Sequence, residues 1–153
     1  MFAGISYFLI ELDKIYFFYI LIICSFSDIG GYIFGKTFKG KKLTKISPNK
    51  TFAGLYGSFI FSLIPSIFFN IVYNYLNIEA LSFANNLLIN FSICIYLSLV
   101  SQLGDLLISY FKRLADVKDT GKILPGHGGL LDRIDGIIFA IPSFGLLAYL
   151  LNY

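Results

Sequence analysis

The sequence predicts an all-α, polytopic membrane protein with about four transmembrane helices and a functional site on its cytoplasmic loops. Hydrophobic residues make up 57% of the 153 residues and charged residues only 14%, against roughly 25% charged residues in typical soluble domains. The mean hydropathy is +0.76, so there are too few polar side chains to cover a water-facing surface. This composition excludes a disordered chain, a secreted disulfide scaffold and a free cytosolic enzyme.

Four stretches are long and apolar enough to span a bilayer, which takes about 20 predominantly apolar residues per helix. Residues 15–35 are interrupted only by Asp28. Three further stretches carry no charge, and they cover residues 51–78, 80–104 and 136–153. Each of the four predicts one transmembrane helix.

Two prolines lie inside these stretches, and Pro65 and Pro142 are expected to bend or break their helices locally. Residues 1–14 are too short to span and lack the features of a signal peptide. They are expected to form a helix stub or an interfacial segment. A single membrane-embedded domain is then predicted over residues 15–153.

The basic residues predict the orientation in the membrane. Six of the twelve lie between Lys36 and Lys50, and five more lie between Lys112 and Arg133. Two predicted spans separate these stretches, so both can lie on the same face, which the positive-inside rule makes cytoplasmic. We expect a multi-pass protein of a bacterial-type plasma (inner) membrane.

The two cysteines, Cys24 and Cys94, lie far apart inside apolar stretches. Neither belongs to a Cys-x-x-Cys pair or a Cys/His cluster, which metal sites and redox centres use. Both are therefore expected to be buried free thiols.

Asp28 is an acid within a predicted span, where a carboxylate is costly and marks a functional site or a water-filled cavity by default. A simpler interpretation places Asp28 at the cytoplasmic end, within reach of interfacial water or a lysine. The adjacent Gly30 and Gly31 permit close approach of another backbone or of a ligand.

A polybasic loop follows the first predicted span. Such a segment attracts anionic lipid headgroups and would equally hold a nucleotide triphosphate, although most of these lysines can be plain topology signals. Lys50 is the exception, because it directly precedes a span. The loop lysines are Lys36, Lys39, Lys41, Lys42, Lys45 and Lys50.

The strongest polar group lies between the last two spans. On a helix, Asp105, Ser109 and Lys112 share one face. Pro125 and three glycines surround His127 and predict a tight turn whose N–H groups can bind phosphate oxygens. Further along the chain, Asp132 and Asp135 lie one helical turn apart. With Asp105 they form a set of hard oxygen ligands suited to Mg²⁺.

These residues resemble the signature of the phosphatidate cytidylyltransferase (CDP-diacylglycerol synthase) family. Two upstream pieces are also similar to that family: residues 28–36, with the pattern Asp-x-Gly-x-Tyr-x-x-Gly-Lys, and residues 47–51. The matching signature comprises Ser109, Lys112-Arg113, Lys118-Asp119, Pro125-Gly126-His127-Gly128-Gly129 and Asp132-Arg133-Ile134-Asp135.

The resemblance implies an enzyme that joins CTP and phosphatidic acid to give CDP-diacylglycerol and pyrophosphate, with Mg²⁺ as cofactor. It implies that Asp105 and Asp132 bind the metal and that Lys112 contacts phosphate. The expected catalytic residues are Asp105, Lys112, His127 and Asp132, and the expected metal ligands are Asp105, Asp132 and Asp135. The expected substrate-binding residues are Asp28, Lys50, Ser109, Arg113, Lys118, Asp119, Gly128, Gly129 and Arg133.

The sequence departs from the family at Ile108 and Ala53, which stand where the family tends to have acids. Family members also usually carry further membrane helices before the matching region. Two alternatives stay open: a related CTP-dependent enzyme on another lipid phosphate, and a truncated, non-catalytic membrane paralogue. The expected partners are CTP, phosphatidic acid, the lipid bilayer and a second copy in a homodimer; no nucleic acid is expected.

Overall fold

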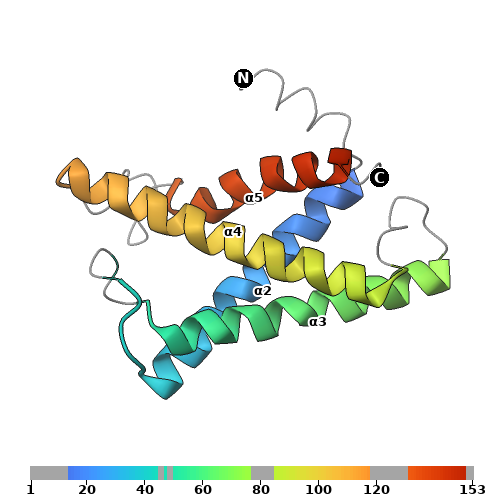
Figure 1. Ribbon diagram of the computed structural model, residues 1–153, viewed down its shortest axis with the longest axis horizontal. Coiled ribbons are helices and arrows are strands. Elements are labelled where there is room, and N and C mark those ends of the chain that lie inside the picture. Colours follow the sequence, from blue (N-terminus) through green and yellow to red (C-terminus); the bar gives the residue numbers. More distant parts are fainter. Residues whose placement is uncertain (1–13, 45–46, 48–49, 77–84, 118–130, 151–153) are drawn as a thin grey trace.

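The computed structural model describes residues 14–44, 47, 50–76, 85–117 and 131–150, with the side chains of residues 131–133 left out. These residues form four α-helices, labelled in Figure 1. They are α2 (Lys14–Phe38), α3 (Phe52–Leu76), α4 (Leu87–Leu114) and α5 (Leu131–Leu150). The predicted all-α class is confirmed for this part of the chain.

Three of the helices, α2, α3 and α4, are long and apolar enough to cross a membrane. The fourth predicted span lies in α5, whose apolar part, Ile134–Leu150, is shorter. α4 differs most from its predicted bounds, because it begins at Leu87 and continues to Leu114. Its last turn carries Lys112 and Arg113. Their positive charges interact favourably with the partial negative charge at a helix C-terminus, and this stabilises the part of the helix that extends beyond its apolar stretch.

Polar side chains define the ends of two helices. Before α4, the Asn86 side chain accepts a hydrogen bond from the Leu88 N–H at 3.1 Å. Before α3, the Thr51 hydroxyl accepts one from the Gly54 N–H at 3.1 Å. Each bond satisfies an N–H group that the first helical turn leaves without a partner.

Both intrahelical prolines lie within continuous helices, Pro65 in α3 and Pro142 in α5. Of the two expected effects, bending or breaking, a break is therefore excluded in both helices. A membrane helix passes through a proline when the carbonyl that loses its N–H partner is accommodated locally.

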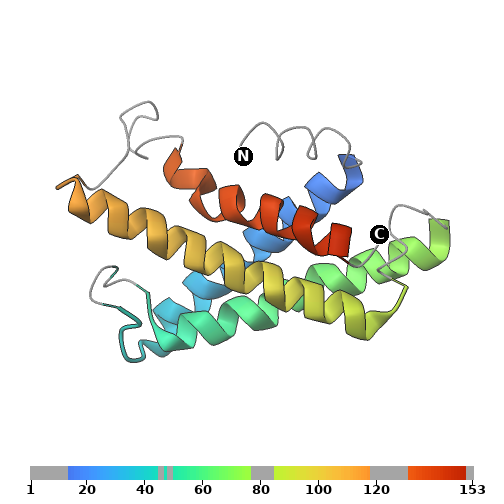
Figure 2. The ribbon, with the colours of Figure 1, turned by 45° about the horizontal axis from the view of Figure 1, so that its top comes forward.

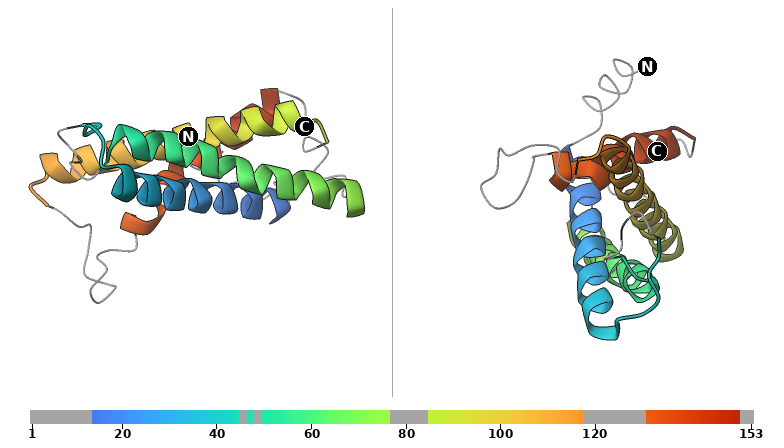
Figure 3. Two further views of the ribbon diagram at one scale, coloured as in Figure 1. Left: turned by 90° about the horizontal axis from the view of Figure 1, so that it is seen from below. Right: turned by 90° about the vertical axis from the view of Figure 1, so that its left-hand side faces the viewer.

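α2 packs along α3, α4 packs along α5, and α3 packs on α4. Figure 3 shows α2 beside α3, and Figure 2 shows α5 lying along α4. Glycines bring α2 and α3 together: a Cβ built on Gly30 would lie 2.5 Å from the Gly57 carbonyl oxygen. A side chain at either glycine is thus excluded, and the two helix backbones approach each other closely beside Phe34 and Phe61.

The buried core draws on all four helices. The Tyr19 side chain extends from α2 to α4, where its hydroxyl donates to the side-chain oxygen Oδ1 of Asn90 at 2.6 Å. Cys24 and Cys94 are both free and buried, as predicted. The core residues are Tyr19, Ile20, Ile23, Cys24, Phe69, Ile93, Cys94, Leu97, Ala140, Phe144 and Ala148.

The elements that carry the polar residues meet at one end of the bundle. The end of α2, the segment that joins it to α3, the C-terminal half of α4 and the start of α5 all lie toward the left-hand end of the view in Figure 1. We call this the loop end. The chain reaches it twice, where α2 ends and α3 begins and where α4 ends and α5 begins, so residues distant in sequence come to the same end of the bundle.

Candidate functional site

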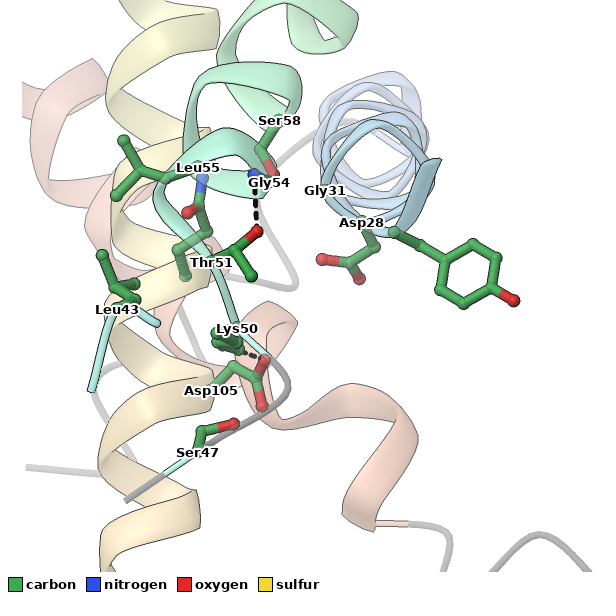
Figure 4. A pocket seen from close by; sticks show the side chains of 12 residues that line it. Asp28, Gly31, Leu43, Ser47, Lys50, Thr51, Gly54, Leu55, Ser58 and Asp105 are labelled. Atoms are coloured by element: carbon green, nitrogen blue, oxygen red, sulfur yellow. Dashed lines mark hydrogen bonds and ion pairs between the residues drawn. The ribbon is translucent and has the colours of Figure 1, made fainter. Parts of the chain in front are cut away.

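A cavity of about 320 Å³ opens at the loop end, between α2, α3 and α4. Its volume is at the lower limit of typical small-molecule sites. Figure 4 shows its lining from close by. The lining residues are Asp28, Gly31, Tyr32, Leu43, Ser47, Lys50, Thr51, Gly54, Leu55, Ser58, Gln102 and Asp105.

The segment before α3 is folded back on itself and places Lys50 in this cavity. Lys42 and Thr51 form an isolated antiparallel bridge. Around it, the Leu43 N–H donates to the Lys50 carbonyl at 2.8 Å and the Phe52 N–H to the Lys41 carbonyl at 3.1 Å. Main-chain hydrogen bonds therefore fix the backbone on both sides of Lys50, independently of the contacts that its side chain makes.

An ion pair crosses the cavity from this segment to α4. The Nζ atom of Lys50 contacts Oδ2 of Asp105, with side chains 25% and 36% exposed. The Asp28 side chain extends from α2 toward this pair (Figure 4), and it interacts electrostatically with both partners. Two carboxylates and one ammonium thus share one polar space.

A second ion pair joins α4 to α5. Nζ of Lys112 lies 3.3 Å from Oδ2 of Asp135, with side chains 14% and 8% exposed. A carboxylate this well buried is costly unless a cation accompanies it. Asp135 also interacts electrostatically with Asp105, so the two ion pairs belong to one charged region.

The structure brings together several of the predicted site residues. Asp28, Lys50 and Asp105 line the cavity, and Lys112 pairs with Asp135 beside it. Two other predicted residues lie on α4: Ser109 is half-buried, and Arg113 is exposed.

The structure describes less of the remaining predicted site residues. Asp132 and Arg133 lie in the first turn of α5, as predicted, but their side chains are not described. Outside the described residues lie Lys118, Asp119, His127, Gly128 and Gly129.

Sequence reasoning missed two polar residues of the cavity wall, Ser58 and Gln102. The signal was present, because Gln102 is a polar residue one helical turn before Asp105 in an otherwise apolar stretch. Gln102 Nε2 donates to the Ser98 hydroxyl at 3.2 Å. The Ser98 hydroxyl shares a 2.7 Å hydrogen bond with that of Ser27 on α2.

The donor set is chemically suited to a hard divalent cation. Asp28, Asp105 and Asp135 come from three helices and interact electrostatically, and carboxylate oxygens are the ligands that Mg²⁺ prefers. Two of the three already hold an ammonium group. Among the residues with described side chains, no three His, Cys, Asp or Glu side chains form a ready metal-binding group; the Asp132 side chain is not part of that set.

The sequence of this chain is similar to those of known proteins. Residues 6–151 match the family described as "Cytidylyltransferase family". The phosphatidate cytidylyltransferase of Rickettsia prowazekii is 44% identical over 131 residues, which cover 85% of this chain and 55% of that protein. That of Staphylococcus haemolyticus is 41% identical over 133 residues, covering 86% of this chain and 48% of that protein. The chain therefore spans about half the length of these relatives.

Proposed function

This chain belongs to the cytidylyltransferase family, and from that premise we propose that it converts CTP and phosphatidic acid to CDP-diacylglycerol and pyrophosphate. A phosphate oxygen of phosphatidate attacks the α-phosphorus of CTP and forms a new P–O bond. The bond from the α-phosphorus to the bridging oxygen breaks, and pyrophosphate leaves with that electron pair. Relatives that match most of this chain are named for this activity.

One observation carries the proposal: acids and lysines from four segments gather at the loop end, where Asp28, Lys50 and Asp105 line one cavity and the Lys112–Asp135 ion pair lies beside it. Both substrates are anionic, so catalysis requires that their phosphates be held in line and their charge neutralised. Among the described residues, Lys50 and Lys112 are the cations of this region that pair with a carboxylate. Each lies in contact with a carboxylate and can transfer its hydrogen bonds to a phosphate oxygen.

We propose that Asp105, Asp132 and Asp135 hold Mg²⁺, which would supply further neutralisation of the nucleotide phosphates. Lys50, Lys112, Arg113 and Arg133 would bind and orient the phosphates, while Asp28 completes the polar cavity. Roles in catalysis or substrate binding for Ser109, Lys118, Asp119, His127, Gly128 and Gly129 stay predictions.

The loop end is proposed to face the cytoplasm of a bacterial inner membrane, where the exposed lysines Lys39, Lys41 and Lys42 satisfy the positive-inside rule. CTP then enters from water and phosphatidate from the leaflet. We also propose a homodimer, because the four described helices have a limited core with which to wall off a charged site. Its mass in mild detergent tests this: an active monomer would contradict it.

The activity is tested with purified protein in detergent–lipid micelles containing CTP, phosphatidic acid and Mg²⁺. Pyrophosphate release and CDP-diacylglycerol, detected by mass spectrometry, are the two readouts. Asp105→Asn removes the carboxylate charge from the cavity and should abolish both. Asp116→Asn is the matched control, because Asp116 is exposed in the turn after α4 at a φ of 52°, which asparagine also adopts.

Product from the wild type and from Asp116→Asn, with none from Asp105→Asn, supports the proposal. Folded wild-type protein that forms no product, while a full-length relative works in the same assay, contradicts it.

A further inference from the structure

The cavity continues past the Lys50–Asp105 ion pair toward the middle of α3 and α4. Gln102 precedes Asp105 by three residues on α4, and both line the cavity. At 1.5 Å of rise per residue, Gln102 lies about 4.5 Å closer to the middle of the helix. Ser58, on α3, is 4% exposed and lies four residues beyond Gly54, on the side away from Lys50. Polar groups of the cavity wall thus extend deeper into the helix bundle than the Lys50–Asp105 ion pair, where the phosphate is proposed to bind.

Gln102 is held in a fixed orientation by buried hydroxyl groups. Its Nε2 donates to Ser98 Oγ at 3.2 Å, and Ser98 Oγ shares a 2.7 Å hydrogen bond with Ser27 Oγ. Both serines are fully buried. A carboxamide nitrogen carries two hydrogens, and the bond to Ser98 uses one of them. The second is available to donate to a ligand.

We infer that Gln102 and Ser58 form a donor site for the ester carbonyl groups of the lipid substrate. The inference rests on the proposed function and deepens it, because it assigns the residues that distinguish the ester-linked acceptor, phosphatidic acid, from ether-linked and polyprenyl phosphates.

The geometry of a membrane lipid favours this assignment. A lipid that enters from the leaflet has its acyl chains toward the bilayer centre, so its ester groups lie a few bonds deeper than its phosphate. With the phosphate at Lys50 and Asp105, the esters come to the level of Gln102 and Ser58. An ester carbonyl oxygen accepts hydrogen bonds only, and at this depth of the wall the Gln102 amide N–H and the Ser58 hydroxyl can donate them.

The chemistry also explains why polar groups are placed at this depth. Polar side chains inside a membrane protein are costly and face a cavity or another helix. Ser27 and Ser98 face each other across α2 and α4, which is ordinary interhelical bonding. Gln102 and Ser58 line the cavity instead, and there they present hydrogen-bonding groups to whatever enters.

The test compares kcat/KM for two lipid acceptors, dioleoyl phosphatidate and its dioleyl-ether counterpart, at saturating CTP. The wild type should prefer the ester lipid by about five- to tenfold, the value of one or two hydrogen bonds to a bound ligand. Gln102→Met keeps the side-chain length without a donor, and it should reduce this preference to less than about twofold. Turnover of the ether lipid should stay unchanged, which also reports a folded variant.

Ser58→Ala is the second variant and should lower the same preference. The matched control is Ser92→Ala, because Ser92 is an α4 serine whose hydroxyl donates to the Leu88 carbonyl at 2.9 Å and does not line this cavity. It should leave the preference at its wild-type value.

Two results would overturn the inference. An equal fall in turnover of both lipids by Gln102→Met and Ser58→Ala would assign these residues to helix packing. A changed preference between CTP and UTP, with the ester preference intact, would assign them to the carbonyl group of the nucleobase.

A binding measurement separates this inference from the proposed activity. Native mass spectrometry of the wild type with the two lipids, without nucleotide, reports retention of each. Retention that favours the ester lipid and depends on Gln102, in a protein that makes no product, supports the ester site while the proposed activity fails. Equal retention of both lipids by a protein that makes CDP-diacylglycerol refutes the ester site alone.

Discussion

Lys50 contacts Asp105 across the cavity, through Nζ and Oδ2, and thereby ties the segment before α3 to the C-terminal half of α4. The two residues flank different apolar stretches of the sequence, and the packing of α3 on α4 brings them together. The same lysine directly precedes Thr51, which forms a backbone bridge with Lys42. Its position is therefore set by main-chain hydrogen bonds and by an ion pair.

Replacement of Lys50 with methionine should lower kcat/KM for CTP by about 100-fold, because one preorganised phosphate contact is lost and the charge of Asp105 is no longer balanced. Lys41→Met removes an exposed lysine of the same segment and should change kcat/KM by less than about twofold. Similar losses in both variants would indicate that the segment acts only through its overall positive charge. Steady-state kinetics at fixed Mg²⁺ makes the comparison.

Loss of the Asp135 carboxylate should destabilise the protein, because the part-buried ammonium group of Lys112 then loses the carboxylate that lies 3.3 Å from it. Asp135→Asn is expected to lower the free energy of unfolding by about 3 kcal/mol. The double variant Asp135→Asn/Lys112→Met should recover part of that loss. Reversible unfolding in mixed micelles measures the cycle, and strictly additive effects would show that the pair is not coupled.

Substitution of Gly57 by alanine should separate α2 from α3. The added Cβ would lie 2.7 Å from the Gly30 carbonyl oxygen, which cannot move without displacing a helix, so we expect a loss of about 2 kcal/mol. In Gly40→Ala the new Cβ would lie 3.6 Å from that of Ala53, an ordinary contact, and the change should stay within about 0.5 kcal/mol. Equal effects of the two alanines would contradict a role for close backbone approach.

Removal of the Tyr19 hydroxyl should affect stability without affecting the site. Tyr19→Phe removes the hydroxyl that donates to the buried side-chain oxygen Oδ1 of Asn90 at 2.6 Å. We expect this to lower the free energy of unfolding by about 1 kcal/mol. Tyr19 precedes Asp28 by nine residues on α2, about 13 Å along the helix axis. The specific activity of the folded variant should therefore equal that of the wild type, and a loss of activity beyond the unfolded fraction would contradict this separation.

The proposed orientation can be tested with single introduced thiols in intact cells. Lys41→Cys lies in the exposed segment at the loop end and should be protected from a membrane-impermeant maleimide. Tyr75→Cys, at a position 84% exposed near the far end of α3, should be labelled. The native Cys24 and Cys94 are buried and should contribute no background. The reverse pattern would invert the topology.

The sequence by itself determined the helical class, the approximate spans and the residues that carry the chemistry. Hydropathy is a property of consecutive residues, so long uncharged stretches predict helices wherever the chain later packs. The acid within the first span could likewise be recognised without coordinates, because a charge inside a membrane is costly and marks a functional site by default.

Only the tertiary structure decided which charges meet. Asp105 and Lys112 share a helix face in sequence terms, yet they pair with different elements, Lys50 before α3 and Asp135 in α5. The glycine contact between α2 and α3 and the depth of Gln102 in the cavity wall were also beyond sequence reasoning. Such contacts depend on how helices cross, and crossing is set by side-chain and backbone packing among segments far apart along the chain.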